Sequence, residues 1–212
     1  MAIDELLDEH EQGERVRSWL RKNGAALLGG VLLGLAVILG WQWWGKRHVA
    51  SLASAHARYE AVAASIQAKD LDKAGKEVAK LTSDNSGIYG ELAALRLAKA
   101  QVDAGKNADA IKVLQSVGSD AQFKPMVDQR LARLLIEVGK PAEAQKLLAS
   151  AKDGTSLEIR ADAAVAQNKR DEARELYTQA LGLVDVASPQ HRLLETKLSD
   201  VGGTVPDPTQ PI

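Results

Sequence analysis

The sequence predicts an all-α protein in which one membrane-spanning helix precedes an array of helical hairpins. Three observations carry this prediction. Residues 24–45 contain no charged side chain, three later stretches of the chain superimpose on one another without a gap, and the apolar-polar alternation of strands is absent after residue 46. Pro125, Pro141 and Pro189 stand where predicted helices begin, which is a position that tolerates proline.

Composition limits the size and the chemistry of the protein. With 212 residues the chain can hold one folded domain of ordinary size and a modest extra segment, but not two large domains. Of its 27 basic and 28 acidic side chains, four and six lie before residue 24, so the remainder is close to neutral. Nucleic acid is therefore not an expected partner, because it would need a basic field. The absence of cysteine excludes disulfides and thiolate zinc sites.

Residues 1–23 form a short charged segment with scattered apolar residues, including Leu6, Leu7, Trp19 and Leu20. This pattern predicts an amphipathic helix with a break near Gly13. Such a helix is either simply solvated or a docking segment for a cytoplasmic partner.

Residues 24–45 are long enough to cross a membrane as one helix. At about 1.5 Å per residue they would extend about 33 Å, against a hydrocarbon core of about 30 Å. A buried helix of a soluble protein would rarely lack a polar face, and a cleaved export signal would have a shorter apolar core followed by small residues. Five residues at the end are instead typical of a membrane interface: Trp41, Trp43, Trp44, Lys46 and Arg47. The sequence therefore predicts an uncleaved anchor.

The charges beside the anchor predict its orientation, and small residues predict one of its faces. Four basic residues precede the anchor and three follow it within about 15 residues, which favours a cytoplasmic amino terminus and places residues 46–201 on the far side. Ala26, Gly30 and Gly34 recur every fourth residue, so they line one stripe of the helix. Another membrane helix could pack closely there, although these residues could also be merely tolerated.

Three stretches beyond the anchor repeat the same pattern: "LAKAQVDAGKNADAIKVLQSV", "LARLLIEVGKPAEAQKLLASA" and "RADAAVAQNKRDEARELYTQA". In each, an alanine stands twelve residues before a second alanine, with Gly-Lys or Asn-Lys between them. Two antiparallel helices can approach closely where small side chains meet, and glycine or asparagine can end the first helix in the left-handed conformation. A fainter copy surrounds Ala61, Lys69, Ala74 and Val78, with one extra turn residue.

These units predict degenerate tetratricopeptide-like hairpins, because one of their spacings, 34 residues, equals the usual repeat length of about 34 and the other is 29 residues. The large aromatic residue near the start of each first helix is missing, and a plain helical bundle is the alternative. Stacked hairpins expose an inner surface lined by their first helices. On that surface we expect a partner groove formed by Leu95, Lys99, Val102, Gln129, Arg133 and Ile136. Alternatively, the last predicted helix, from Ser188, caps the array and covers some of these groups; residues 202–212 are expected to be a flexible tail.

No pattern of catalytic or ligand-binding residues is found in the sequence. The histidines at positions 10, 48, 56 and 191 lack the spacing of metal ligands, and nucleophile elbows or phosphate-binding loops are missing. We therefore expect no enzymatic activity, no metal and no cofactor.

Six short motifs in order make the chain resemble a known family: Asn23-Gly24, "GVLLG" from Gly30, "GWQWW" from Gly40, "YGELAALRLA" from Tyr89, "RLARL" from Arg130 and "RDEAR" from Arg170. It is similar to the YfgM-type ancillary subunits of the bacterial SecYEG translocon. The resemblance implies a single-pass inner-membrane protein with a cytoplasmic amino terminus and a periplasmic repeat domain. That domain would act with the membrane-anchored chaperone PpiD and help to transfer newly exported client proteins to periplasmic chaperones. An envelope assembly scaffold and a regulator acting through residues 1–23 are the alternatives.

Overall fold

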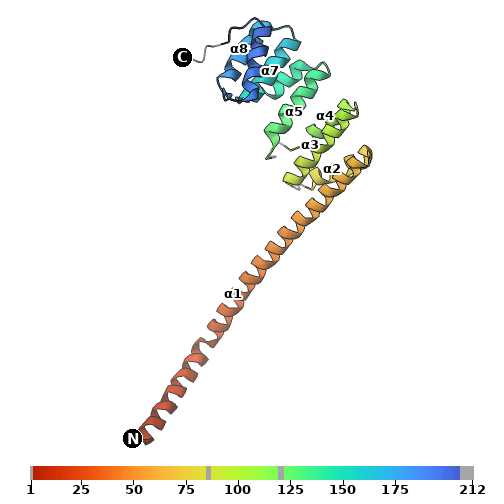
Figure 1. The fold of residues 1–212 in the computed structure, drawn as a ribbon. Helices are drawn as coiled ribbons and strands as arrows, with labels where there is room; N and C mark the ends of the chain where they lie inside the picture. Colours follow the sequence, from red (N-terminus) through yellow and green to blue (C-terminus); the bar gives the residue numbers. More distant parts are fainter. Residues whose placement is uncertain (1, 85–86, 119–121, 206–212) are drawn as a thin grey trace. The chain divides into compact units, whose positions relative to one another are not determined.

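The computed structural model describes residues 2–84, 87–118 and 122–205, with the side chains of residues 2–12 and 48 left out. Within these ranges every regular element is an α-helix, as predicted (Figure 1). The chain divides into two compact units, Met1–Ala53 and Ser54–Ile212. The helices are α1 (Ala2–Gln67), α2 (Leu71–Ser83), α3 (Ile88–Asp103), α4 (Asn107–Gln115), α5 (Lys124–Glu137), α6 (Pro141–Leu147), α7 (Gly154–Ala166), α8 (Arg170–Leu181) and α9 (Pro189–Asp200).

The first unit consists of the amino-terminal part of α1. The helix continues through Gly13, so the predicted break there is wrong. A glycine inside a helix costs only about 1 kcal/mol relative to alanine, which good helix formers on both sides can offset. The apolar side chains of residues 24–45 are exposed, for example Leu28 and Leu33. Among the described helices, this is the one that is long and apolar enough to cross a membrane.

The second unit consists of four helical hairpins followed by α9. The end of α1 and α2 share one apolar cluster and are joined by the Arg58–Asp84 ion pair. The next hairpins pair α3 with α4, α5 with α6 and α7 with α8. One alanine of each second helix is fully buried against the first helix: Ala74, Ala110, Ala144 and Ala173. The residues twelve positions earlier are also buried: Val62, Ala98, Ala132 and Ala161.

The first hairpin corrects one detail of the predicted repeat. Ala61 is exposed and Val62 is buried at the crossing with α2, so this repeat contains no extra turn residue. The alanine pattern misplaced the register because a valine occupies the position that is alanine in the other repeats.

The same turn closes the first helix of every hairpin. Lys69, Gly105, Gly139 and Asn168 have positive φ angles between 59 and 78°, and each stands five residues before the buried alanine of the second helix. The next residue in each turn donates its backbone N–H to a carbonyl five residues earlier, at 2.7 to 2.9 Å. This is the Schellman arrangement, which satisfies carbonyl groups left over at a helix end.

Helix α9 resembles the first helix of a further hairpin that lacks its second helix. Gly202 has a φ of 79°, and the Gly203 N–H donates to the Leu198 carbonyl oxygen at 2.9 Å, as in the turns above. Leu194 and Leu198 are fully buried against a cluster that includes Tyr177. The ordered chain therefore includes Gly202 and Gly203, while residues 206–212 of the expected tail lie outside the described residues.

Candidate interaction groove

A pocket of about 350 Å³ brings together four of the six residues that the alignment of the three repeats, here called the repeat frame, assigns to the inner surface. These four are Leu95, Lys99 and Val102 of α3 and Arg133 of α5. The other four lining residues were not among the predicted ones: Ala98, Leu114, Arg130 and Leu134. The pocket lies within the second unit, between the first helices of two successive hairpins.

The pocket has an apolar floor and a basic rim. Leu95, Leu114 and Leu134 are buried, whereas the side chains of Lys99, Arg130 and Arg133 are exposed. Lys99 is paired with Asp103 of its own helix, with 2.6 Å between Nζ and Oδ2. In the described part of the chain, neither arginine forms a hydrogen bond or an ion pair.

The remaining two predicted residues do not line this pocket. Gln129 donates from Nε2 to Asp153 Oδ1 at 3.0 Å and to Ser156 Oγ at 3.1 Å. Asp153 is the N-cap residue of α7, so Gln129 joins α5 to the start of α7. Ile136 is half-buried and packs against the core. The repeat frame identifies the face of a helix but does not indicate which side chains a neighbouring helix uses.

On α7, the corresponding inner positions carry acids that α9 neutralises. Lys197 of α9 donates to Glu158 Oε1 at 2.7 Å and to Asp162 Oδ2 at 2.8 Å, and Gln190 also donates to Glu158. Tyr177 donates its hydroxyl to Asp162 at 2.5 Å. Helix α9 thus occupies polar groups of the last hairpin and contributes no residue to the pocket between α3 and α5.

These contacts determine the ionisation of the cluster. Burial by itself would raise the pKa of Glu158, but the hydrogen bonds from Lys197 and Gln190 outweigh it and hold the pKa below its usual value. Burial, followed by the hydrogen bond to Asp162, raises the pKa of the Tyr177 hydroxyl. The lowered pKa of Glu158 and the raised pKa of Lys197 favour an ionised carboxylate beside a charged lysine at neutral pH, while the raised pKa of Tyr177 keeps its hydroxyl protonated.

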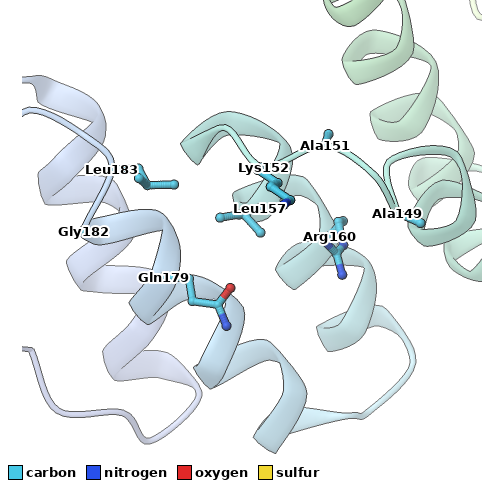
Figure 2. Close-up of a pocket in the computed structure, with 8 residues that line it drawn as sticks. All are labelled: Ala149, Ala151, Lys152, Leu157, Arg160, Gln179, Gly182 and Leu183. Atoms are coloured by element: carbon cyan, nitrogen blue, oxygen red, sulfur yellow. The ribbon is translucent and has the colours of Figure 1, made fainter.

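A second pocket, of about 520 Å³, lies beside the connection between α6 and α7 and the end of α8. Figure 2 shows the side chains of Leu157 and Leu183 facing the same space, with Arg160 and Gln179 further along the two helices. Leu183 is 59% exposed. The sequence did not indicate this pocket, because most of its lining residues follow α6 or α8 in the connections between helices.

The buried acids of the second unit have structural partners. Glu91 of α3 accepts backbone N–H groups of Gln122 and Phe123, at 3.0 and 2.5 Å, just before α5 begins. Together with Glu158 it accounts for the buried carboxylates of the described residues. His56 stacks beside Tyr89, and His191 lies 3.3 Å from Glu195. In residues 13–84, 87–118 and 122–205, no three metal-ligand side chains gather.

The first unit presents its predicted residues on an exposed helix surface. Trp41, Trp43 and Trp44 are exposed, and the Arg47 guanidinium carbon lies 4.0 Å from the Trp43 ring centroid. Lys46 is also exposed. Ala26 and Gly30 line a shallow groove with Trp19, Asn23, Leu27 and Val31, whereas Gly34 does not. A role of this stripe in helix packing stays a prediction.

Comparison with known proteins gives a consistent family relationship. Residues 17–203 match the family model described as a tetratricopeptide repeat-like domain. The ancillary SecYEG translocon subunit of Escherichia coli (strain K12) is 36% identical over 109 residues, which are 51% of this chain and 52% of that protein. The protein with the same description from Haemophilus influenzae is 23% identical over 93 residues, or 44% of this chain and 46% of that protein.

The predicted resemblance to ancillary translocon subunits is thus confirmed, although the chain spans about half the length of the curated relatives it matches. Among solved structures, the tetratricopeptide repeat domain of P58(IPK) is 18% identical with a TM-score of 0.44, covering 70% of this chain and 45% of that one.

Proposed function

This chain belongs to the family of tetratricopeptide repeat-like domains, and from this membership we propose that it is a membrane-anchored interaction subunit of the SecYEG translocon. The observation that carries the proposal is the combination of one exposed apolar helix with a hairpin array whose inner surface holds an open pocket. The choice of the translocon is supported by the two relatives, both of which are ancillary SecYEG translocon subunits.

In this proposal residues 24–45 anchor the protein in the bacterial inner membrane. Residues 1–23 lie in the cytoplasm and residues 46–201 in the periplasm, where tethering raises the effective concentration of the repeat domain near the channel exit. There the domain works with PpiD and helps newly exported proteins to reach periplasmic chaperones. It acts by binding and not by catalysis, since its buried carboxylates serve structural contacts.

Site-specific photocrosslinking in cells tests the proposal. A photoreactive residue at Arg133, in the pocket, should trap a translocon subunit or PpiD. The same residue at Glu175, on the exposed surface of α8, should trap much less. Recovery of only cytosolic proteins from the Arg133 position would contradict the proposal.

Three further experiments test the topology and separate the alternatives. Alkaline phosphatase fused after Ile212 should be active, because the fusion would lie in the periplasm. Mass spectrometry after a mild-detergent pull-down should be dominated by the translocon, whereas another envelope machine in its place would favour an assembly scaffold. Deleting residues 2–22 should leave these partners in place; their loss would favour a regulator that acts through the cytoplasmic segment.

A further inference from the structure

We infer that the pocket between α3 and α5 binds an extended partner segment in which an acidic side chain adjoins an aliphatic one. The inference deepens the proposed function and rests on it, because it assigns a chemical class to the partner of the same pocket. It is carried by a difference between two equivalent arginines of the repeat array.

Arg96 and Arg130 occupy the same repeat position, nine residues before the left-handed glycines Gly105 and Gly139. Arg96 is satisfied by the preceding hairpin: its Nη1 lies 3.3 Å from the Tyr59 hydroxyl oxygen, and its guanidinium carbon lies 5.8 Å from the Tyr59 ring centroid. The repeat array therefore shows that an arginine at this position can contact an aromatic hydroxyl of the preceding hairpin when its own chain supplies one.

For Arg130 this built-in partner is missing. The residue that corresponds to Tyr59 in the preceding hairpin is Leu95, which stands ten residues before Gly105 as Tyr59 stands ten before Lys69. Leucine offers neither a hydrogen-bond acceptor nor an aromatic face. The guanidinium of Arg130 consequently borders an apolar floor and has no acceptor among the residues that the structure describes.

Arg133 adds a second cation to the same rim. It is attracted to Glu158, but this carboxylate is already bound by Lys197. The third cation, Lys99, is paired with Asp103. The pocket thus has two guanidinium groups able to bind a carboxylate with charge-assisted hydrogen bonds.

The apolar floor favours a ligand that has an aliphatic group beside its carboxylate over a small anion. The half-buried Val102 and the small exposed parts of Leu95 and Leu134 would stay in contact with water under a small ion, whereas an aliphatic side chain next to the carboxylate would cover them. A volume of about 350 Å³ is at the lower end of ligand pockets, which are roughly 300 to 1,000 Å³, and matches a short extended segment better than a folded surface.

Fluorescence anisotropy with the full chain in zwitterionic nanodiscs tests this inference. The probes are short labelled peptides of serine, glycine and threonine with a central Asp-Leu-Glu, its neutral counterpart Asn-Leu-Gln, or the apolar-deficient Asp-Ser-Glu. We expect the Asp-Leu-Glu peptide to bind about tenfold more tightly than either counterpart, since each loses one of the two recognised groups. Binding should weaken as salt is added.

Two variants assign the binding to the pocket. R130Q/R133Q should weaken binding of the Asp-Leu-Glu peptide at least about tenfold. K146Q/R170Q removes the same charge from exposed positions on second helices and should bind as the unchanged protein does. A third variant, L95Y, gives Arg130 the partner that Arg96 already has and occupies the floor, so it should also abolish binding. Circular dichroism confirms that each variant is folded.

Equal binding of the neutral peptide, an equal loss in K146Q/R170Q, or no binding at millimolar peptide would each overturn the inference. These results leave the proposed function standing if the photocrosslinks to the translocon persist. Conversely, peptide binding without such crosslinks would retain the pocket chemistry and reject the translocon as its setting.

Discussion

The Nζ atom of Lys197 lies 2.7 Å from a carboxylate oxygen of Glu158 and joins α9 to α7. The Glu158 side chain is only 6% exposed, so this pair is shielded from solvent on the acid side. The contact holds the last helix on the array and neutralises the acidic inner positions of α7. The inner positions of α7 therefore differ from the pocket between α3 and α5, whose rim carries the exposed cations Arg130 and Arg133.

Replacing Lys197 by methionine should destabilise the helical-repeat unit by roughly 2 to 3 kcal/mol, because a buried carboxylate loses its countercharge. Chemical denaturation followed by circular dichroism measures this change. Lys112, whose side chain is 75% exposed, forms a surface ion pair with Asp109. Lys112→Met removes this pair and should change the free energy of unfolding by less than about 0.5 kcal/mol. Similar effects for the two variants would show that the Glu158 contact does not stabilise the fold.

Glu158 should also make stability depend on acid. Its pKa is lowered in the folded state, so the unfolded chain binds a proton first as the pH falls. The stabilisation is complete above the ordinary glutamate pKa of about 4.3 and is lost as the pH falls through the lower folded value. Glu158→Gln should be less stable than the unchanged protein at neutral pH, and the difference should shrink between about pH 5 and pH 3. A constant difference in melting temperature over this range would contradict the assignment.

The turn at Lys69 offers a stabilising substitution. Lys69 has a φ of 59°, which costs a residue with a side chain about 1 kcal/mol and costs glycine almost nothing. Lys69→Gly should therefore raise the free energy of unfolding by about 0.5 to 1 kcal/mol. Lys73→Gly, inside α2, should lower it by about 1 kcal/mol. If both glycines destabilise equally, the left-handed turn of the first hairpin is not formed in solution.

Two glycines should respond in opposite ways to alanine. A Cβ atom on Gly75 would lie 4.0 Å from the nearest atom, Leu97 Cδ2, so Gly75→Ala should stabilise α2 by about 0.5 to 1 kcal/mol. At Gly203 a Cβ atom would lie 2.2 Å from Leu198 Cδ1, and Leu198 is fully buried. Gly203→Ala should therefore destabilise the docking of α9, which thermal unfolding would detect. Tolerance of alanine at Gly203 would mean that the end of α9 is not closed as described.

The fold could be predicted from the sequence because small residues and turn formers recur at fixed spacing. Ala110, Ala144 and Ala173 identify the hairpins, since only small side chains allow two helices to approach so closely. The first hairpin was displaced by one residue because Val62 replaces the expected alanine. The residue type alone does not show whether a valine lies at the point where two helices cross or beside it.

The candidate site was predictable only in part, for a different physical reason. The repeat frame gives the direction in which a side chain leaves its helix, and this located Leu95, Lys99, Val102 and Arg133. Whether a polar side chain is available to a partner depends on its contacts with neighbouring helices, and the spacing of residues in the sequence does not predict these contacts. Gln129 contacts the start of α7, whereas Arg130 forms no hydrogen bond or ion pair with residues 2–84, 87–118 or 122–205.

The anchor makes the most direct prediction about the whole chain. Nine Leu, Ile and Val residues favour insertion of residues 24–45 by about 3 to 5 kcal/mol, and an arginine at the centre of a span costs about 2.5 to 3.5 kcal/mol. Leu35→Arg removes one favourable residue and adds this cost, so it should release much of the protein from membranes under alkaline carbonate and lower the activity of a carboxy-terminal alkaline phosphatase fusion. Leu20→Arg introduces the same charge before the apolar stretch and should leave both measurements unchanged. Retention of the Leu35→Arg protein in the membrane would show that another part of the chain holds it there.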